Sequence, residues 1–412
     1  MNRSSTRRLC WVRILTGVLV SCVGMLLCNG GMAHPPVTMR AVKVPVQFID
    51  YQFAVKNDQR GVPVFDWKEF RKRPSETVST LWSGIELAND FIKVQIVPSM
   101  ARIHSLVNQR TANEQLWINP CAKPLGANND TGFWMTWGGI ERVMPRREHG
   151  TSHALDWKHQ LLVDDDTRKT IKCSCIEPLT QMRHELYFTL FRDKPFLETK
   201  IVIHNQSDKL TKYSHWSTAV LAPGESDEVT GNTELILPAD KFVPDDRDFN
   251  DWMHGLPLGT RTSPLRWVKN WKSIGDLLTT KLRQPFYAVY SHESDEGLVH
   301  TFDLEQSPTV DIWGWGFPVE ANRQREFTAA TPNNGYIEFW NGNAKNFKDE
   351  SLRTLSADET ISWTERTFCV DHLLQRPLTV RESIGQLVEM HHPVAKRVTL
   401  PARDTTGSSR GE

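Results

Sequence analysis

The sequence lacks the short motifs that mark many common catalytic and cofactor sites. It contains no glycine-rich phosphate loop, no Gly-x-Ser-x-Gly turn and no His-Glu-x-x-His pair. After residue 33 it has no run rich in lysine and arginine, and acidic side chains slightly outnumber basic ones. Proteins that bind nucleic acids carry a clustered basic footprint. The sequence therefore argues against nucleotide, metalloprotease and nucleic-acid functions.

Long apolar runs are also scarce. Only residues 14–28 are almost wholly apolar, and about 15 residues fall short of the roughly 20 that span a bilayer. A basic segment precedes this run, and small residues, Gly31 and Ala33, occupy the −3 and −1 positions of a cut after Ala33. This order is typical of a secretory signal. We expect residues 1–33 to be a signal peptide cleaved near Ala33, and the mature chain to be periplasmic or extracellular without a membrane span. An uncleaved N-terminal anchor and a lipid anchor at Cys22 are the alternatives.

Cysteine is infrequent, with 7 residues in the chain. Four of them follow the expected cleavage site, namely Cys121, Cys173, Cys175 and Cys369. In an oxidising compartment an even number allows one or two disulfides, whose pairing the sequence does not define. Cys173 and Cys175 have the spacing of a metal-binding pair, but no cluster of histidines or cysteines accompanies them. We expect two ordinary strand cysteines, no metal and no cofactor.

Convincing long amphipathic helices are missing between about residues 40 and 370. Short β-type runs separated by turn residues occur instead, at 91–97, 186–191, 196–204, 285–290, 309–313, 335–340 and 360–368. Strands that recur without helices between them predict an all-β fold, a large antiparallel β-sandwich.

The domain organisation follows from this pattern. We expect one sandwich domain over residues 34–371, then a C-terminal helix and a disordered tail in 372–412, the helix at 378–391. The chain has 15 tryptophans, and tryptophans recur in two stretches without clear strands, 117–157 and 245–284. Such long segments are usually functional loops.

Four places hold side chains suited to catalysis. Glu141 and His149 follow Trp137 and a glycine pair, and Arg142, Arg146 and Arg147 lie among them. His215 stands beside Trp216, Asp240 follows a strand, and Glu338 interrupts an apolar strand that ends in Trp340. Each has an ordinary alternative: a solvated charged loop, a core histidine, a turn aspartate and an exposed edge-strand glutamate.

These segments, in this order, resemble the galactose mutarotase-like family, the aldose 1-epimerase superfold, and within it an uncharacterised and often secreted branch. Ile96-Val97-Pro98-Ser99-Met100-Ala101-Arg102-Ile103 resembles the strand and turn that carry the family's substrate-site arginine, with Met-Ala in place of Gly-Gly. The other matching segments are Trp137-Gly138-Gly139-Ile140-Glu141 with Pro145 and His149, Tyr213 to Ala219, Pro238 to Asp246, and Gly335-Tyr336-Ile337-Glu338.

The resemblance implies a supersandwich fold and an enzyme that acts on the anomeric centre of a sugar. It implies Glu338 as the general base and His215 as the general acid. It further implies a sugar-binding set in which polar groups hold hydroxyls and indole faces stack on the ring: Arg102, Trp137, Glu141, His149, Trp216, Asp240 and Trp340.

Two other functions stay open. An exported chain with tryptophan-rich loops also suits a polysaccharide lyase, with Arg102, Arg142, Arg146 and Arg147 as cationic candidates, or a hydrolase, with Glu141, Asp240 and Glu338 as candidate carboxylates. A non-catalytic sugar-binding protein would keep the aromatic surfaces without needing an acid and a base. In each case the expected partner is a sugar or a polysaccharide.

Overall fold

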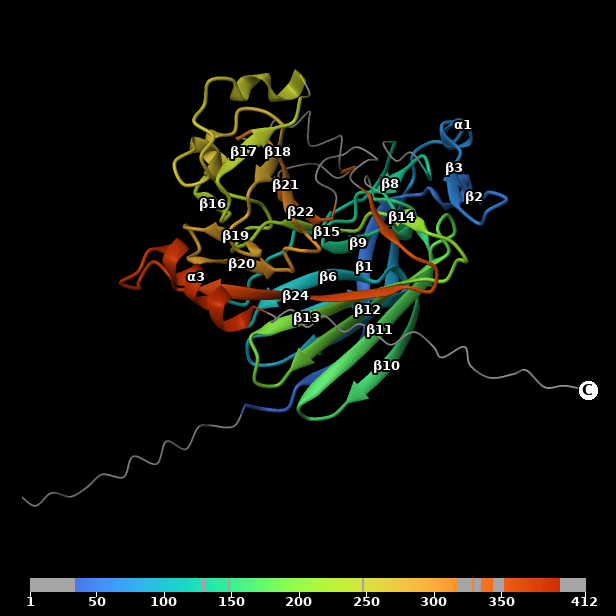
Figure 1. Cartoon of the computed structure of the whole chain (residues 1–412), viewed down its shortest axis with the longest axis horizontal. Coiled ribbons are helices and arrows are strands. Elements are labelled where there is room, and N and C mark those ends of the chain that lie inside the picture. The colour runs from blue at the N-terminus through green and yellow to red at the C-terminus, as the bar shows by residue number, and fades with distance from the viewer. Residues whose placement is uncertain are drawn as a thin grey trace, which may run out of the picture. The chain divides into compact units, whose positions relative to one another are not determined.

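The computed structural model describes residues 34–126, 130–146, 149–246, 248–317, 328–329, 335–343 and 352–392. The expected signal peptide and Cys22, the expected disordered tail after His392, and Arg147 lie outside these ranges. Within them, strands dominate and form two large sheets, which confirms the predicted antiparallel sandwich (Figure 1).

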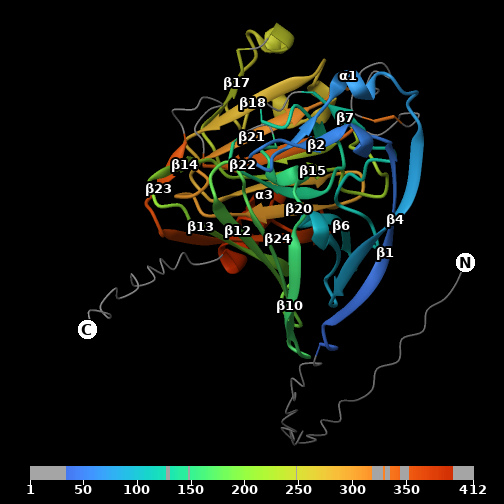
Figure 2. The ribbon, with the colours of Figure 1, turned by 90° about the vertical axis from the view of Figure 1, so that its right-hand side faces the viewer.

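The larger sheet of the described chain has ten strands, and every neighbouring pair is antiparallel. In spatial order they are β1 (Thr38–Ile49), β4 (Thr77–Ala88), β5 (Ile92–Val97), β6 (Arg102–Asn108), β9 (Ile140–Val143), β15 (Trp216–Leu221), β22 (Ile337–Gly342), β21 (Thr309–Gly314), β18 (Gly275–Thr280) and β17 (Lys241–Pro244). The centre of this sheet therefore joins β9, β15 and β22, which are far apart in the sequence. Figure 2 shows β1 and β4 curving along one edge.

The smaller sheet has eight strands. In spatial order they are β10 (Lys158–Asp164), β11 (Arg168–Ile176), β12 (Met182–Phe191), β13 (Phe196–Asn205), β24 (Thr360–Asp371), β20 (Glu296–Thr301), β19 (Phe286–Ser291) and β16 (Thr233–Ile236). Three further antiparallel pairs join β2 (Val55–Asn57) to β3 (Pro63–Phe65), β7 (Pro124–Leu125) to β8 (Trp134–Met135), and β14 (Thr211–Tyr213) to β23 (Arg353–Leu355).

The main core lies between the two sheets. In β5 the side chains of Ile92, Val94 and Ile96 are fully buried, and Lys93 and Gln95 between them are half-buried. This alternation points every second side chain into the core. Ile201 and Ile203 of β13 belong to the same core cluster as the β5 residues, so the two sheets pack face to face.

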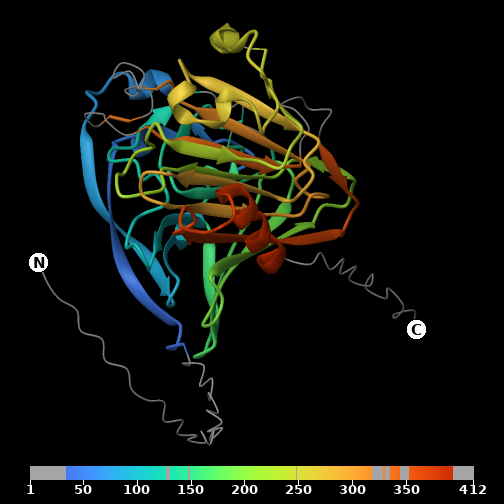
Figure 3. The same cartoon turned by 90° about the vertical axis from the view of Figure 1, so that its left-hand side faces the viewer.

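The expected C-terminal helix is α3 (Val380–His391). It begins with a capping box in which Thr379 and Glu382 exchange hydrogen bonds. Its apolar stripe, Val380, Ile384 and Val388, packs on side chains of the smaller sheet such as Phe286, Val299 and Phe368, on the face away from the main core (Figure 3).

The two tryptophan-rich stretches are more regular than expected. Residues 117–157 include β9, and 245–284 include β18, so both contribute strands to the larger sheet. The first stretch also holds β7, β8 and the short helical turn η3 (Ser152–Ala154), and the second holds η4 (Asp248–Met253), η5 (Pro264–Arg266) and η6 (Val268–Asn270). Outside them the described chain forms the short turns η1 (Gln52–Ala54), α1 (Trp67–Phe70) and η2 (Pro98–Met100).

The four cysteines after residue 33 are all free thiols. Cys173 and Cys175 belong to β11 and are buried, as expected of strand cysteines. Burial raises the pKa of Cys173 to about 12, so its thiol stays protonated at neutral pH. Among the described helices, none has the length and apolarity needed to cross a bilayer.

Candidate functional site

Four strands of the larger sheet and the loop before β9 build a small pocket on the outer face of this sheet, the face opposite the smaller sheet. We call it the Arg102 pocket. Its lining consists of Arg102, Trp117, Trp134, Met135, Thr136, Trp137, Gly138, Glu141, His149, Thr218, Val220, Tyr336 and Glu338. Antiparallel pairing sets Thr218 beside Glu141 and Val220 beside Glu338. Residues of β6, β9, β15 and β22 therefore face one another here, although the sequence separates them widely.

A chain of charged contacts occupies the floor of the pocket. The guanidinium of Arg102 donates to one carboxylate oxygen of Glu141 and to the carbonyl oxygen of Gly138. The other carboxylate oxygen of Glu141 meets Nδ1 of His149. All three side chains are buried. Because Nδ1 already contacts Glu141, Nε2 is the ring nitrogen of His149 that can hydrogen-bond a ligand.

The electrostatics of the group follow from its burial. Burial by itself would raise the pKa of Glu141, but the charges of Arg102 and His149 outweigh it and lower this pKa to about 2. Glu141 is therefore ionised at neutral pH. Burial lowers the pKa of Arg102, while Glu141 and Glu338 both favour its charged form. The Arg102 cation thus pairs with Glu141 and is also attracted to the charge of Glu338.

Aromatic side chains enclose these polar groups. The indole of Trp134 stacks on the imidazole of His149, with ring centroids 4.1 Å apart and planes 15° apart. Trp340 meets the same imidazole edge-on at 5.0 Å, and Trp117 packs against Tyr336 at 4.4 Å. The free volume that remains is about 20 Å³, enough for about one water molecule. A larger ligand must displace one of these side chains.

The glycine pair shapes this pocket from below. Gly138 and Gly139 have φ values of 76° and 73°, which side chains other than glycine rarely adopt. A Cβ on Gly138 would lie 2.3 Å from the carbonyl oxygen of Trp117, and one on Gly139 at 2.3 Å from that of Ile103. Both glycines therefore approach neighbouring backbone too closely for a side chain.

His215 does not join this group. It immediately precedes β15, and its ring contacts those of His184 and Trp363 at 5.2 and 4.9 Å. Both partners belong to the smaller sheet. The imidazole is buried between the two sheets, where burial lowers its pKa to about 3. Strand alternation explains the placement, because β15 turns odd-numbered residues inward and even-numbered residues toward the Arg102 pocket.

A second polar network, which the sequence did not indicate, lies in this inter-sheet layer. The Glu365 carboxylate of β24 pairs with Arg142 at 3.0 Å and accepts hydrogen bonds from Ser217 and Asn341. His300 lies 3.3 Å from it. Burial opposes the charge of Glu365, yet Arg142 and His300 hold its pKa well below the usual range.

Of the remaining predicted site residues, some line or border the Arg102 pocket and others lie outside it. Trp137 lines the pocket, and Trp340 borders it through His149. Trp216 is fully buried and packs on Trp340 at 6.2 Å. Asp240 precedes the edge strand β17 and pairs with Arg283, so it lies outside the pocket lining. Of the lyase candidates, Arg102 lies in the pocket and Arg142 in the inter-sheet layer, while Arg146 is not among the lining residues.

Several residues of the pocket are not among the predicted site residues. Trp117, Trp134, Thr218 and Tyr336 line it. Thr218 and Tyr336 belong to two segments that carry the family resemblance, but their local sequence does not show that they reach the site. Within the described ranges, no group of three or more His, Cys, Asp or Glu side chains has the arrangement of a metal site.

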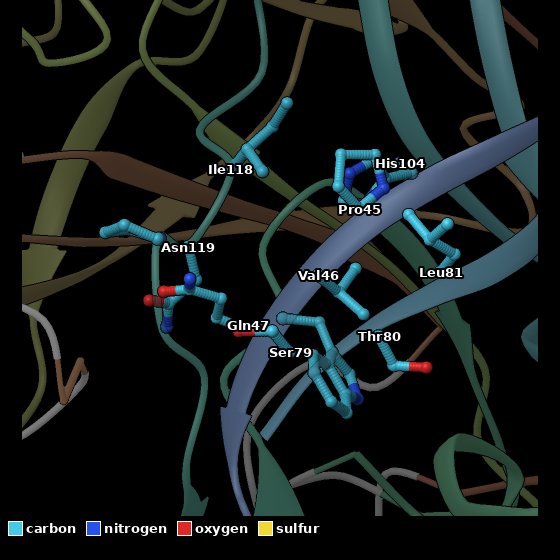
Figure 4. Close-up of a pocket in the computed structure, with 11 residues that line it drawn as sticks. Pro45, Val46, Gln47, Ser79, Thr80, Leu81, His104, Ile118 and Asn119 are labelled. Carbon is cyan, nitrogen blue, oxygen red and sulfur yellow. The ribbon is translucent and has the colours of Figure 1, made fainter. Parts of the chain in front are cut away.

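The larger open space of the same face adjoins the Arg102 pocket. We call it the His104 pocket; its volume is about 420 Å³ (Figure 4). It lies between the paired strands β1 and β4 and residues 118–120, and is lined by Pro45, Val46, Gln47, Ser79, Thr80, Leu81, His104, Ile118, Asn119, Pro120 and Trp137. Trp137 lines both pockets.

Solved structures place this architecture in a known fold class. A TPR-domain containing protein from Parabacteroides distasonis matches with a TM-score of 0.66 and 16% identity, over 90% of this chain and 59% of its own. A proposed aldose 1-epimerase from Klebsiella pneumoniae matches with a TM-score of 0.53 and 10% identity, over 86% of this chain and 95% of its own. A galactose mutarotase related enzyme from Lactobacillus acidophilus matches with a TM-score of 0.50 and 13% identity, over 70% of this chain and 97% of its own.

The chain therefore has the galactose mutarotase-like fold, as the sequence resemblance implies. It belongs to the family described as domain of unknown function DUF5107, whose profile matches residues 59–364. The chain spans 59% of the length of the Parabacteroides protein.

Proposed function

We propose that this protein is a carbohydrate isomerase that interconverts the anomers of an aldose, the reaction of aldose 1-epimerases, after export from the cytoplasm. One observation carries the proposal: Glu338 and His149, a carboxylate and an imidazole from separate strands and loops, line one pocket with Arg102 between two carboxylates. The fold shared with the proposed aldose 1-epimerase from Klebsiella pneumoniae supports it.

The reaction needs a base and an acid on opposite sides of a pyranose ring. Glu338 takes the proton from the anomeric hydroxyl, and Nε2–H of His149 gives a proton to the ring oxygen as the C1–O5 bond breaks. The open-chain aldehyde rotates about C1–C2, and the same two groups reverse both transfers. A carboxylate can accept the proton of the anomeric hydroxyl and an imidazole N–H can donate one to the ring oxygen, which are the two transfers that the reaction requires.

The proposal assigns the acid to His149 where the family resemblance implies His215. His149 faces the pocket, and the Glu141 carboxylate fixes the orientation of its ring through Nδ1. His215 faces Trp363 in the inter-sheet layer. Arg102 holds Glu141 in place through a hydrogen-bonded ion pair, and its positive charge also attracts the Glu338 carboxylate.

A sugar ring needs more room than the pocket has when Trp134 covers His149. Trp134 lies on the two-residue strand β8 and is half-buried. We propose that the sugar displaces this indole from His149 and stacks against it. The stacking of an indole on the apolar face of a sugar then provides part of the binding energy.

The test is anomer exchange measured by NMR on the full-length chain with a panel of free aldoses. The parent is expected to accelerate exchange of at least one aldose. Glu338→Gln should lower kcat by about 10²–10⁴-fold with a small change in KM. Glu225→Gln, which changes an exposed carboxylate outside the pocket, should keep the parent rate.

Two results would overturn the proposal. One is a parent that accelerates exchange of no aldose; the other is a Glu338→Gln variant as fast as the parent. New reducing ends from a polysaccharide would instead support a cleaving enzyme on this fold.

A further inference from the structure

The His104 pocket has no role in the reaction just described, although it adjoins the reacting site. We propose that it is a second sugar subsite, so that the substrate is a neutral reducing oligosaccharide. The reducing-end ring occupies the Arg102 pocket and the next ring occupies the His104 pocket. This inference rests on the proposed function and names its substrate class.

The two pockets are contiguous on one face of the sheet. Arg102 and His104 are two residues apart on β6, so their side chains point to the same face. Trp137 stands between them and lines both spaces. A ligand that reacts beside Arg102 therefore extends naturally past Trp137 into the larger space.

The His104 pocket is large enough to hold a small molecule such as a sugar ring. About 420 Å³ lies within the range of roughly 300–1,000 Å³ that small-molecule sites occupy. The Arg102 pocket holds about 20 Å³, so the room for a bound molecule on this face lies mainly on the far side of Trp137. Val46, Leu81 and Ile118 give the larger space apolar walls.

The polar groups of the pocket indicate an uncharged ligand. Among the described residues that line it, eleven in all, none is an aspartate, glutamate, lysine or arginine. Burial, and then the charge of Arg102, lower the pKa of His104 to about 4, so its imidazole is neutral at pH 7. A neutral imidazole both donates and accepts one hydrogen bond, which suits a hydroxyl.

His104 also has hydrogen-bonding capacity to spare. Its side chain is 6% exposed, and no group in the described part of the chain hydrogen-bonds its ring nitrogens. A buried polar group usually has a partner. Figure 4 draws His104 toward one side of the pocket and Gln47 and Asn119 toward the other. Polar groups at both sides of an apolar space match a sugar ring, which has apolar faces and a rim of hydroxyls.

The absence of charge distinguishes this ligand from two others. A polysaccharide lyase would bind a uronate unit, whose carboxylate needs a cation. The described residues that line the pocket include no lysine or arginine. An alkyl chain would satisfy Leu81 and Ile118 but would leave His104 without a partner. A neutral sugar can pack its apolar faces on Leu81 and Ile118 and can hydrogen-bond His104 through its hydroxyls.

The test is titration calorimetry of the full-length chain with glucose, galactose, cellobiose, lactose and octyl glucoside. We expect one of the two disaccharides to bind about tenfold or more tightly than either monosaccharide. Thr80→Trp, which fills the pocket from its half-buried wall, and His104→Leu, which removes the imidazole, should each abolish that gain. Thr38→Trp, which changes an exposed residue at the other end of the same pair of strands, should retain it.

Three outcomes would overturn the inference: disaccharides that bind no more tightly than monosaccharides, a gain that survives both pocket variants, or octyl glucoside as the tightest ligand. Thermal melting shows whether each variant is folded. Calorimetry measures binding without turnover, so a disaccharide gain in a chain that exchanges no anomers would contradict the proposed function and keep the subsite.

Discussion

Glu141 and Arg142 are neighbours in β9, yet their side chains serve opposite faces of the larger sheet. Glu141 meets Arg102 and His149 in the outer pocket, and Arg142 pairs with Glu365 between the sheets at 3.0 Å. One short strand therefore ties the candidate site to the core. Through Arg142, Ser217 and Glu365, the inter-sheet network links β9, β15 and β24. It thereby supports the pairing register of β9 and β15, which places Glu141 beside Thr218 in the pocket.

The first prediction concerns the inter-sheet network. Glu365→Gln leaves Arg142 as a buried charge without its partner, which typically costs about 3–5 kcal/mol of unfolding free energy. Glu198→Gln is the matched control, because Glu198 pairs with Arg366 at 2.8 Å where both side chains are about one-fifth exposed. The control should cost about 1 kcal/mol or less. Denaturant unfolding measures both, and equal losses would contradict the structural role of Glu365.

The second prediction is a loss of stability in mild acid. Burial lowers the pKa of both His153 and His215 to about 3, whereas an unfolded histidine titrates near about 6.5. The unfolded chain therefore binds protons below about pH 6.5 that the folded chain does not bind until about pH 3. The free energy of unfolding is therefore highest above about pH 6.5 and decreases as the pH falls from about 6.5 toward about 3. The decrease is roughly 2 kcal/mol per histidine between about pH 6.5 and pH 5.

Urea unfolding over this pH range measures the effect. His215→Phe removes one of the titrating groups and should flatten the pH dependence relative to the parent, whatever it does to stability at neutral pH. An unchanged slope in this variant would show that His215 does not titrate as its burial requires.

The third prediction separates steric contact from backbone strain in the glycine turn. Gly139→Ala meets the Ile103 carbonyl oxygen at 2.3 Å in a backbone with φ of 73°, whereas Gly61→Ala has φ of 83° and no atom within 4 Å. Gly61→Ala should cost about 1–2 kcal/mol from its conformation alone. Gly139→Ala should cost clearly more, because backbone must also shift. Similar losses in thermal or urea unfolding would refute the close approach.

The fourth prediction concerns the Trp134 indole. If a sugar displaces it from His149, binding should change tryptophan fluorescence in a saturable way. Trp134→Phe should abolish most of that change, and Trp267→Phe should preserve it, because Trp267 packs on His292 away from the pocket. A full signal in Trp134→Phe would mean that the indole stays on His149.

Much of the fold follows from the sequence. The strands β5, β12, β13, β19, β21, β22 and β24 coincide with the predicted runs because their apolar side chains alternate or cluster between turn residues. The sequence does not predict strands β9 and β18, because tryptophan and glycine residues interrupt the apolar pattern around them. Their strand state depends on pairing with β15 and β21, which local sequence does not reveal.

The candidate site could be predicted only in part. Arg102, Glu141, His149 and Glu338 were identified as site candidates from motifs, and the structure brings them into one pocket. The same motifs suggested His215 and Asp240, which lie elsewhere. For His215 the deciding fact is the face of the sheet to which its side chain points. A shift of one residue in register reverses that face, and no local sequence feature fixes it.

The most direct measurement compares the two histidines in the anomer-exchange assay. His149→Gln should lower kcat/KM by about 10²-fold or more, because the pocket loses its acid. His215→Gln should destabilise the fold but, at a temperature where it remains folded, keep kcat/KM within about threefold of the parent. A His149→Gln variant with parental activity beside an inactive, folded His215→Gln variant would contradict the account and restore His215 as the acid.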